Sequence, residues 1–194
     1  MMQTFDIFLR KYRTLLRIGV FHYVRMTNDR AFLSGLAMIY GFDPWHAQAP
    51  TSARPYRHVV ARLANALSPR TVVEVGCGLG GILALVDAPD RYGYDIDERV
   101  IRAARFLRGR RITFTCGGIT AVSLAQIDVL ILVNWIHAIS PVALEQLLAP
   151  MLARSRYLLL DAIDQDGPDS YQYKHDFAFL GAATRVVSIT RAPG

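Results

Sequence analysis

The 194-residue sequence contains few cysteines and no long apolar run. Its two cysteines, Cys77 and Cys116, offer neither a disulfide framework nor the ligand spacing of a metal site. We therefore expect a protein of the reducing cytoplasm that holds no metal. The longest apolar runs, such as residues 129–133, are far shorter than the roughly 20 residues of a membrane-spanning helix. The N-terminus has no basic region leading into an apolar run, so we predict no cleavable signal peptide.

Charge is also scarce, and it is unevenly placed. Charged residues make up 20% of the chain and hydrophobic residues 52%, a composition that excludes intrinsic disorder. Residues 1–70 hold ten Lys+Arg against three Asp+Glu, whereas residues 71–194 hold twelve against thirteen. The larger part of the chain is therefore nearly neutral and does not require a polyanionic substrate, so nucleic acid is not an expected partner.

The basic N-terminal segment has two interpretations. Within residues 4–21, Phe, Leu, Ile and Tyr side chains alternate with four basic residues, as in helices that lie on membrane surfaces. The pattern predicts either a peripheral contact with the inner membrane surface or a helix that packs on the protein's own α/β domain.

Helical spacing of apolar residues runs through the first 70 residues and gives way to alternating strands and helices from residue 71. Short apolar runs predict strands at 71–75, 92–95, 111–115, 128–133, 157–160 and 184–190. Helices are expected at 5–18, 31–42, 53–67 with Ser52 as N-cap, 98–107, and 141–153 with Ser140 as N-cap. The alternation predicts an α/β fold with a doubly wound, mostly parallel sheet of about six strands. We divide the chain into a basic helical extension, residues 1–52, and an α/β domain, residues 53–194.

A glycine-rich loop follows the first predicted strand and is expected to open into a helix at Ile82. Its glycine spacing fits two patterns, one ending at Gly80 and one ending at Gly81. Glu74 lies inside the strand, where a dinucleotide-binding fold normally has an apolar residue, and a buried acid there needs partners. Asp95 ends the next strand, 21 residues after Glu74, where a carboxylate can accept both hydroxyls of a ribose.

With these residues the chain resembles the class I S-adenosylmethionine-dependent methyltransferases, a Rossmann-like family, over roughly residues 53–190. The resemblance rests on the acid and alternating glycines of the loop, on Asp95, and on the strand order that follows. It implies S-adenosylmethionine as cofactor, with the methionine moiety over the loop, the ribose at Asp95, and the adenine near the end of strand three. The implied cofactor-binding residues are Glu74, Gly76, Cys77, Gly78, Gly80, Asp95, Ile96, Gly117, Asn134 and Tyr56.

Two features depart from this family. Many members have an acid after strand three that holds the adenine amino group, whereas this chain has Cys116-Gly117-Gly118. Backbone groups and apolar contacts, such as those of Ile96, must then recognise the adenine. Only one strand follows strand five, instead of the usual two, so we expect a shortened sheet edge or an edge completed by a partner.

Two histidines are candidates for the general base that a hydroxyl or protonated amine acceptor requires. His137 follows strand four, and His175 follows strand five beside Tyr171 and Tyr173. The alternative for His137 is a structural histidine that caps the following turn. The alternative for His175 is an ordinary position on an amphipathic segment.

The sequence therefore predicts an S-adenosylmethionine-dependent methyltransferase that acts on an O- or N-acceptor of small-molecule size, with saccharides and lipid-linked precursors among the candidates. Three alternatives remain open at this point. They are an RNA methyltransferase, an NAD-binding oxidoreductase, and a non-catalytic scaffold whose basic helix binds a membrane or a partner.

Overall fold

The computed structural model describes residues 20–48, 50–163, 172–184, 186 and 189–190. The chain forms two compact units, Met1–Pro55 and Tyr56–Gly194, and each is described by itself. The predicted helix at 5–18 lies outside the described residues, as does most of the 4–21 segment.

The first unit is helical. It contains α2 (Val20–Tyr40), α3 (Trp45–Gln48) and the 3-10 turn η1 (Thr51–Ala53). The Ser52 hydroxyl donates a hydrogen bond of 2.7 Å to the Asp29 carboxylate, and the Arg54 guanidinium lies 4.2 Å from the centre of the Trp45 ring. The prediction that Ser52 caps a helix beginning at residue 53 is wrong, because its hydroxyl is used within the first unit and the next α-helix begins at Tyr56.

The second unit is built on five parallel strands in the order β3-β2-β1-β4-β5. The strands are β1 (Thr71–Val75), β2 (Asp90–Asp95), β3 (Thr113–Cys116), β4 (Ile127–Leu132) and β5 (Ser155–Leu160). The α/β fold class is confirmed, and the described residues form five strands where about six are predicted. Of the predicted last strand at 184–190, the described residues are not in a strand, and the remaining three lie outside the described part of the chain.

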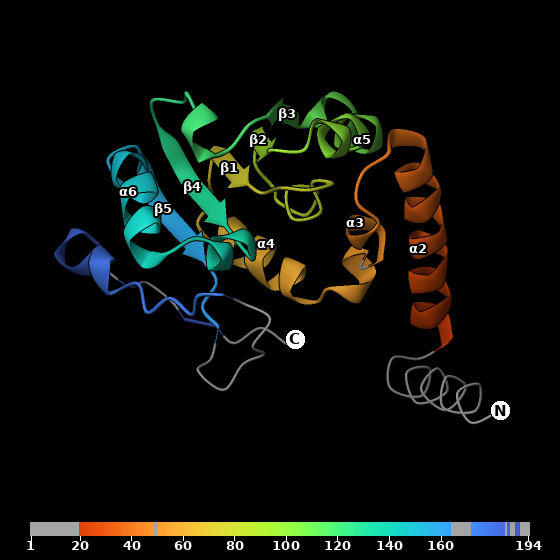
Figure 1. Ribbon diagram of the computed structural model, residues 1–194, viewed down its shortest axis with the longest axis horizontal. Coiled ribbons are helices and arrows are strands. Elements are labelled where there is room, and N and C mark those ends of the chain that lie inside the picture. Colours follow the sequence, from red (N-terminus) through yellow and green to blue (C-terminus); the bar gives the residue numbers. More distant parts are fainter. Residues whose placement is uncertain (1–19, 49, 164–171, 185, 187–188, 191–194) are drawn as a thin grey trace. The chain divides into compact units, whose positions relative to one another are not determined.

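Helices cover both faces of this sheet, as expected for parallel strands with alternating crossovers. One core cluster joins one face of β1 and β4 to α4 (Tyr56–Ala66) and α5 (Glu98–Arg108). A second cluster joins the opposite face to α6 (Pro141–Leu152), which lies beside β5 in Figure 1. Short 3-10 turns complete the unit at η2 (Gly109–Arg111), η3 (Ile119–Ala121), η4 (Trp135–Ala138) and η5 (Ala178–Ala183).

The predicted helix after the glycine loop does not form; residues 78–85 make a series of turns. The Ala84 amide bonds to the Gly80 carbonyl as in an α-helix, but the Leu85 and Val86 amides bond three residues back. The Arg91 guanidinium donates to the carbonyls of Leu83 and Val86 at 3.2 and 3.1 Å. The Asp87 amide, which a continuing helix would bond to the Leu83 carbonyl, donates instead to the Asn65 side chain at 2.8 Å. The connection from β1 to β2 is therefore short and compact.

No helix in the described ranges has both the length and the apolar character needed to cross a membrane.

Candidate functional site

The carboxyl ends of the five strands meet along one edge of the sheet, where ligands bind in open α/β folds. Val75, the last residue of β1, is in register with Tyr94 of β2 and Leu132 of β4. Asp95 at the end of β2 is in register with Cys116 at the end of β3. The topology therefore brings the glycine loop, Asp95, the turn after β3 and the loop after β4 to the same edge, as the sequence predicts.

The glycine loop packs tightly against two aromatic rings. Gly76 and Gly80 have φ values of 72° and 67°, in the left-handed region that glycine adopts without strain. A Cβ on Gly76 would lie 2.4 Å from Cδ1 of Trp135, and one on Gly80 would lie 2.6 Å from Cζ of Phe114. Both positions require glycine, and the indole of Trp135 lies directly against the loop.

Asp95 is tied to the loop through its side chain. Its Oδ2 accepts a hydrogen bond of 2.9 Å from the Gly78 amide, and its Oδ1 accepts one of 3.1 Å from the Asp97 amide. A carboxylate offers about four acceptor positions, so two remain after these bonds. The amides orient the buried carboxylate and leave it the capacity to accept a pair of hydroxyl groups.

The turn after β3 lies next to Asp95. The Gly117 amide donates a hydrogen bond of 2.8 Å to the Asp95 carbonyl. Ile96, beside this turn, is 81% exposed. A Cβ on Gly118 would lie 3.8 Å from Cγ2 of Ile96, so the glycine turn and the isoleucine face each other at contact distance. Cys116 is exposed at the same place, whereas Cys77 in the glycine loop is buried, and burial raises the pKa of the Cys77 thiol.

Glu74 is a buried acid under the glycine loop, with 5% of its surface exposed. Burial raises its pKa to about 8, and the charges of Arg57 and Arg108 only partly oppose this effect. A hydrogen bond from the Leu83 backbone also favours the ionised form. Its Oε2 has no hydrogen-bond partner among the described residues. At neutral pH Glu74 is therefore predominantly protonated.

The second residue after β4 is held by two side chains in an uncommon conformation. Asn134 has φ 74° and ψ −50°, and it is one of three described non-glycine residues with positive φ. Its amide donates to both carboxylate oxygens of Asp161, at 3.0 and 3.1 Å, and its side-chain amide donates to the Tyr56 hydroxyl at 2.8 Å. Asn134, Tyr56 and Asp161, which come from distant parts of the sequence, are thus joined in one network.

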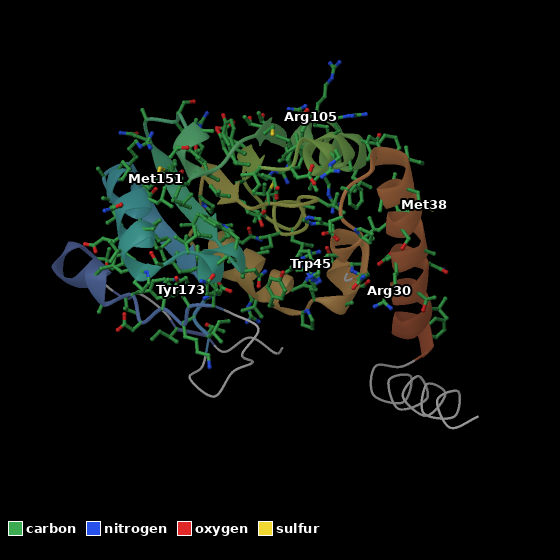
Figure 2. The ribbon with its side chains drawn as sticks, viewed as in Figure 1. Arg30, Met38, Trp45, Arg105, Met151 and Tyr173 are labelled. Atoms are coloured by element: carbon green, nitrogen blue, oxygen red, sulfur yellow. The ribbon has the colours of Figure 1, made fainter. Side chains whose placement is uncertain are left out.

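Both candidate histidines are buried beside that network. Nδ1 of His137 lies 3.1 Å from the Tyr173 carbonyl, and its Nε2 lies 3.2 Å from Oδ2 of Asp161. Nε2 of His175 lies 3.0 Å from the Ile136 carbonyl, and its Nδ1 is buried without a hydrogen-bond partner in the described structure. The centres of the two imidazole rings are 5.7 Å apart. Tyr173, labelled in Figure 2, lies on the segment that makes these contacts.

The residues present fit S-adenosylmethionine at this edge. Asp95 retains acceptor positions for a ribose, and the exposed Ile96 and the glycine turn after β3 form an apolar surface for a planar base. The glycine loop also contains an unused buried acceptor, Oε2 of Glu74, and an unused buried donor, Nε1 of Trp135. Buried polar atoms of this kind normally find a partner, and a bound ligand is one such partner.

Solved structures share this architecture. Magnesium protoporphyrin IX methyltransferase (ChlM) from Synechocystis PCC 6803, with bound SAM, is 17% identical over 65% of this chain and 65% of that chain, with a TM-score of 0.51. TehB from Haemophilus influenzae is 18% identical over 60% of this chain and 46% of that chain, with a TM-score of 0.50. The fold is that of the class I S-adenosylmethionine-dependent methyltransferases.

The likeness to this methyltransferase fold is partial. The match spans less than two thirds of the length of ChlM and of TehB. No protein-family model matches the sequence, and no curated protein matches it either. Among the residues that the structure describes, no cluster of three or more His, Cys, Asp or Glu side chains is arranged to hold a metal ion.

Sequence reasoning missed two contributors to the site. Trp135 was not predicted to lie against the glycine loop, although it immediately follows Asn134 at the end of β4. Asp161 is not among the residues predicted to form the site, yet it contacts both Asn134 and His137. The available signal was its position directly after β5, at the carboxyl edge of a parallel sheet.

Proposed function

We propose that the protein is an S-adenosylmethionine-dependent methyltransferase that acts on a small-molecule O- or N-acceptor. The observation that carries this proposal is the Asp95 carboxylate, which is bonded to the Gly78 amide of the glycine loop at the carboxyl edge of a 3-2-1-4-5 sheet. The magnesium protoporphyrin IX methyltransferase with the same fold supports an acceptor of small-molecule size.

Each predicted cofactor residue has a role in this proposal. Asp95 accepts the ribose hydroxyls, Ile96 and Gly117 border the adenine, and Glu74 and the loop from Gly76 to Gly80 surround the methionine moiety. Tyr56 and Asn134 border the same moiety on the side of β4, and their side chains are hydrogen-bonded to each other. Bound S-adenosylmethionine would supply an electrophilic methyl group on a sulfonium, and the protein's task is then to align an acceptor in line with the carbon–sulfur bond.

The two histidines are suited to different tasks. Both ring nitrogens of His137 face oxygens that only accept hydrogen bonds, the Tyr173 carbonyl and the Asp161 carboxylate, so the ring binds both only with a proton on each nitrogen. His175 donates from Nε2 to the Ile136 carbonyl, which leaves Nδ1 as a proton acceptor without a partner in the described residues. Where the acceptor must lose a proton, we assign that step to His175 and a supporting role to His137.

Isothermal titration with S-adenosylhomocysteine tests the cofactor assignment. Asp95→Asn should weaken binding by about tenfold or more, because a hydrogen bond to a charged group is lost. Asp97→Asn is the matched control, since Asp97 lies two residues away and caps α5 through the Arg99 amide. The control should bind within about twofold of wild type. Folded wild-type protein that shows no binding at millimolar ligand would remove the proposal.

The acceptor's chemical class and the cellular location remain predictions. A cytoplasmic protein with peripheral membrane contact through residues 4–21 should float with anionic liposomes. A variant lacking residues 1–25 should not. Equal flotation of both proteins would exclude that contact.

A further inference from the structure

Asn134 holds a backbone conformation that needs an external support. Its φ of 74° and ψ of −50° lie in a region that few non-glycine residues occupy, although asparagine tolerates positive φ better than most. Such conformations persist only where surrounding contacts hold them, and they concentrate at functional sites. Asn134 is such a case, because it stands between β4 and the turn η4 at the edge where ligands bind.

The main support is the Asp161 carboxylate. Both of its oxygens accept from the Asn134 amide, at 3.0 and 3.1 Å, so the acid holds the backbone directly. The side chain of Asp161 is 24% exposed, which leaves it free to swing toward water unless something fixes it. His137 is the group placed to do so.

His137 connects Asp161 to the segment after β5. Its ring has no exposed surface and lies between two oxygens, the Tyr173 carbonyl at 3.1 Å and Oδ2 of Asp161 at 3.2 Å. The ring attracts both oxygens only with a proton on each nitrogen, and in that form it pairs with the Asp161 carboxylate as an imidazolium. The Tyr173 amide donates back to the His137 carbonyl at 3.0 Å, which fixes the backbone on which the ring is carried. The ring of His175 lies 5.7 Å away and supports the imidazole from one side.

The conformation of Asn134 determines where the next side chain goes. Trp135 follows directly, and its Cδ1 lies 2.4 Å from the position of a Gly76 Cβ, so the indole rests on the glycine loop. A change in the turn at Asn134 would move this indole away from Gly76. It would also draw the Asn134 side chain from the Tyr56 hydroxyl, 2.8 Å away.

We propose that Asp161, oriented by His137, is a positioning residue that holds Asn134 in its positive-φ conformation and thereby sets Trp135 and Tyr56 around the methyl-donor site. This inference rests on the proposed function for its ligand. It assigns His137 a role through Asp161, and it links the donor site to the segment that carries Tyr173 and His175.

The first measurement needs no ligand. Amide exchange of Asn134, followed by nuclear magnetic resonance, should accelerate at least about tenfold in Asp161→Asn and in His137→Gln. Asp128→Asn is the matched control. The Asp128 carboxylate also accepts hydrogen bonds from two backbone amides, those of Arg70 at 2.8 Å and Thr71 at 2.9 Å, but at the opposite end of the strands. Unchanged exchange at Asn134 in both site variants would overturn the proposal, whether or not the protein binds S-adenosylhomocysteine.

The second measurement tests positioning against simple structural damage. Asp161→Asn should weaken S-adenosylhomocysteine binding about tenfold, whereas Asp128→Asn should change it less than about twofold. Glycine adopts φ 74° without strain, so Asn134→Gly combined with Asp161→Asn should bind within about twofold of Asn134→Gly alone. His137→Gln added to Asp161→Asn should likewise cause no further loss.

The outcomes separate the two ideas. If the wild-type protein binds no S-adenosylhomocysteine, the proposed function fails and the exchange data alone decide the positioning role. If the wild type binds and the double variant with Asn134→Gly still loses the full tenfold, Asp161 does not act through the turn, and the positioning proposal fails while the proposed function stands.

Discussion

Replacing Glu74 with glutamine should remove a large dependence of stability on pH. Burial raises the pKa of Glu74 from 4.5 to about 8. Between these two values the folded protein keeps a proton that the unfolded chain releases, so stability falls as the pH rises. Each pH unit costs about 1.4 kcal/mol, and the whole interval costs about 5 kcal/mol. The loss is complete above pH 8 and absent well below pH 4.5.

This cost is about a third or more of the roughly 5–15 kcal/mol by which proteins of ordinary stability are folded. Glu74→Gln keeps the size and the neutral charge of the protonated acid. We therefore expect wild type and variant to differ by less than about 1.5 kcal/mol at pH 5. At pH 9 the variant should be the more stable protein by several kcal/mol.

Urea denaturation at half-unit steps from pH 4.5 to 9.5 measures this difference. The quantity to compare is the unfolding free energy of wild type minus that of Glu74→Gln at each pH. Glu145→Gln, which changes an exposed acid on α6, is the control. Its curve of unfolding free energy against pH should run parallel to that of wild type. If the wild-type and Glu74→Gln curves also run parallel, Glu74 is ionised in the folded protein and the reasoning from its burial is wrong.

Three further predictions concern local structure. Gly76→Ala should destabilise the protein by about 2–4 kcal/mol in urea denaturation, because the new Cβ meets Trp135 at 2.4 Å in a left-handed turn. Cys116 should react with Ellman's reagent in the native protein, whereas Cys77 should react only on unfolding, since one thiol is exposed and the other buried. Ser140→Ala should cost about 1 kcal/mol, because the hydroxyl that accepts from the first turn of α6 is lost.

Each of these has a control in the same chain. Gly35→Ala, where no atom lies within 4 Å of the new Cβ, should not destabilise α2. Cys116→Ser should abolish the reaction of the native protein with Ellman's reagent, while Cys77→Ser should leave it intact. Ser140→Thr should keep most of the capping energy. A Gly76→Ala variant as stable as wild type, or two thiols that react equally fast, would contradict the packing described for the glycine loop.

The sheet follows closely from local sequence patterns. The run at 71–75 is β1 as predicted, and α5 and α6 end within one residue of their expected bounds. These elements have apolar runs of the right length, and α6 has clear start signals in Ser140 and Pro141. Parallel topology then places the strand ends, and with them Asp95 and the glycine loop, at one edge.

The helix expected at Ile82 fails for a tertiary reason. Only a few residues separate Gly81 from Pro89, and the Arg91 side chain from the next strand bonds the carbonyls of Leu83 and Val86. The Asp87 amide donates to the Asn65 side chain instead of to the Leu83 carbonyl. The local pattern shows the apolar run but not these two side chains from other elements. A helix this short also gains little from its own hydrogen bonds.

The contacts around Asn134 are equally hidden from local pattern. Asp161 lies 27 residues after Asn134 in the chain, and Tyr56 lies 78 residues before Asn134. Sequence spacing alone does not pair such residues, because their meeting depends on the lengths of the intervening helices and loops. The sequence indicates which strand ends carry polar groups, and the fold determines which of those groups bond.

The strand order has a consequence for synthesis of the protein on the ribosome. β1 is central, and its second neighbour is β4, with Val72 in register with Val129, 57 residues later. While β1, β2 and β3 have been made and β4 has not, the apolar strand β1 has one unpaired edge. Such edges promote aggregation, and pairing across so long a separation is slow. Nascent chains and truncated fragments that end before residue 127 should therefore depend on chaperones, whereas those that extend past β5 can close the sheet.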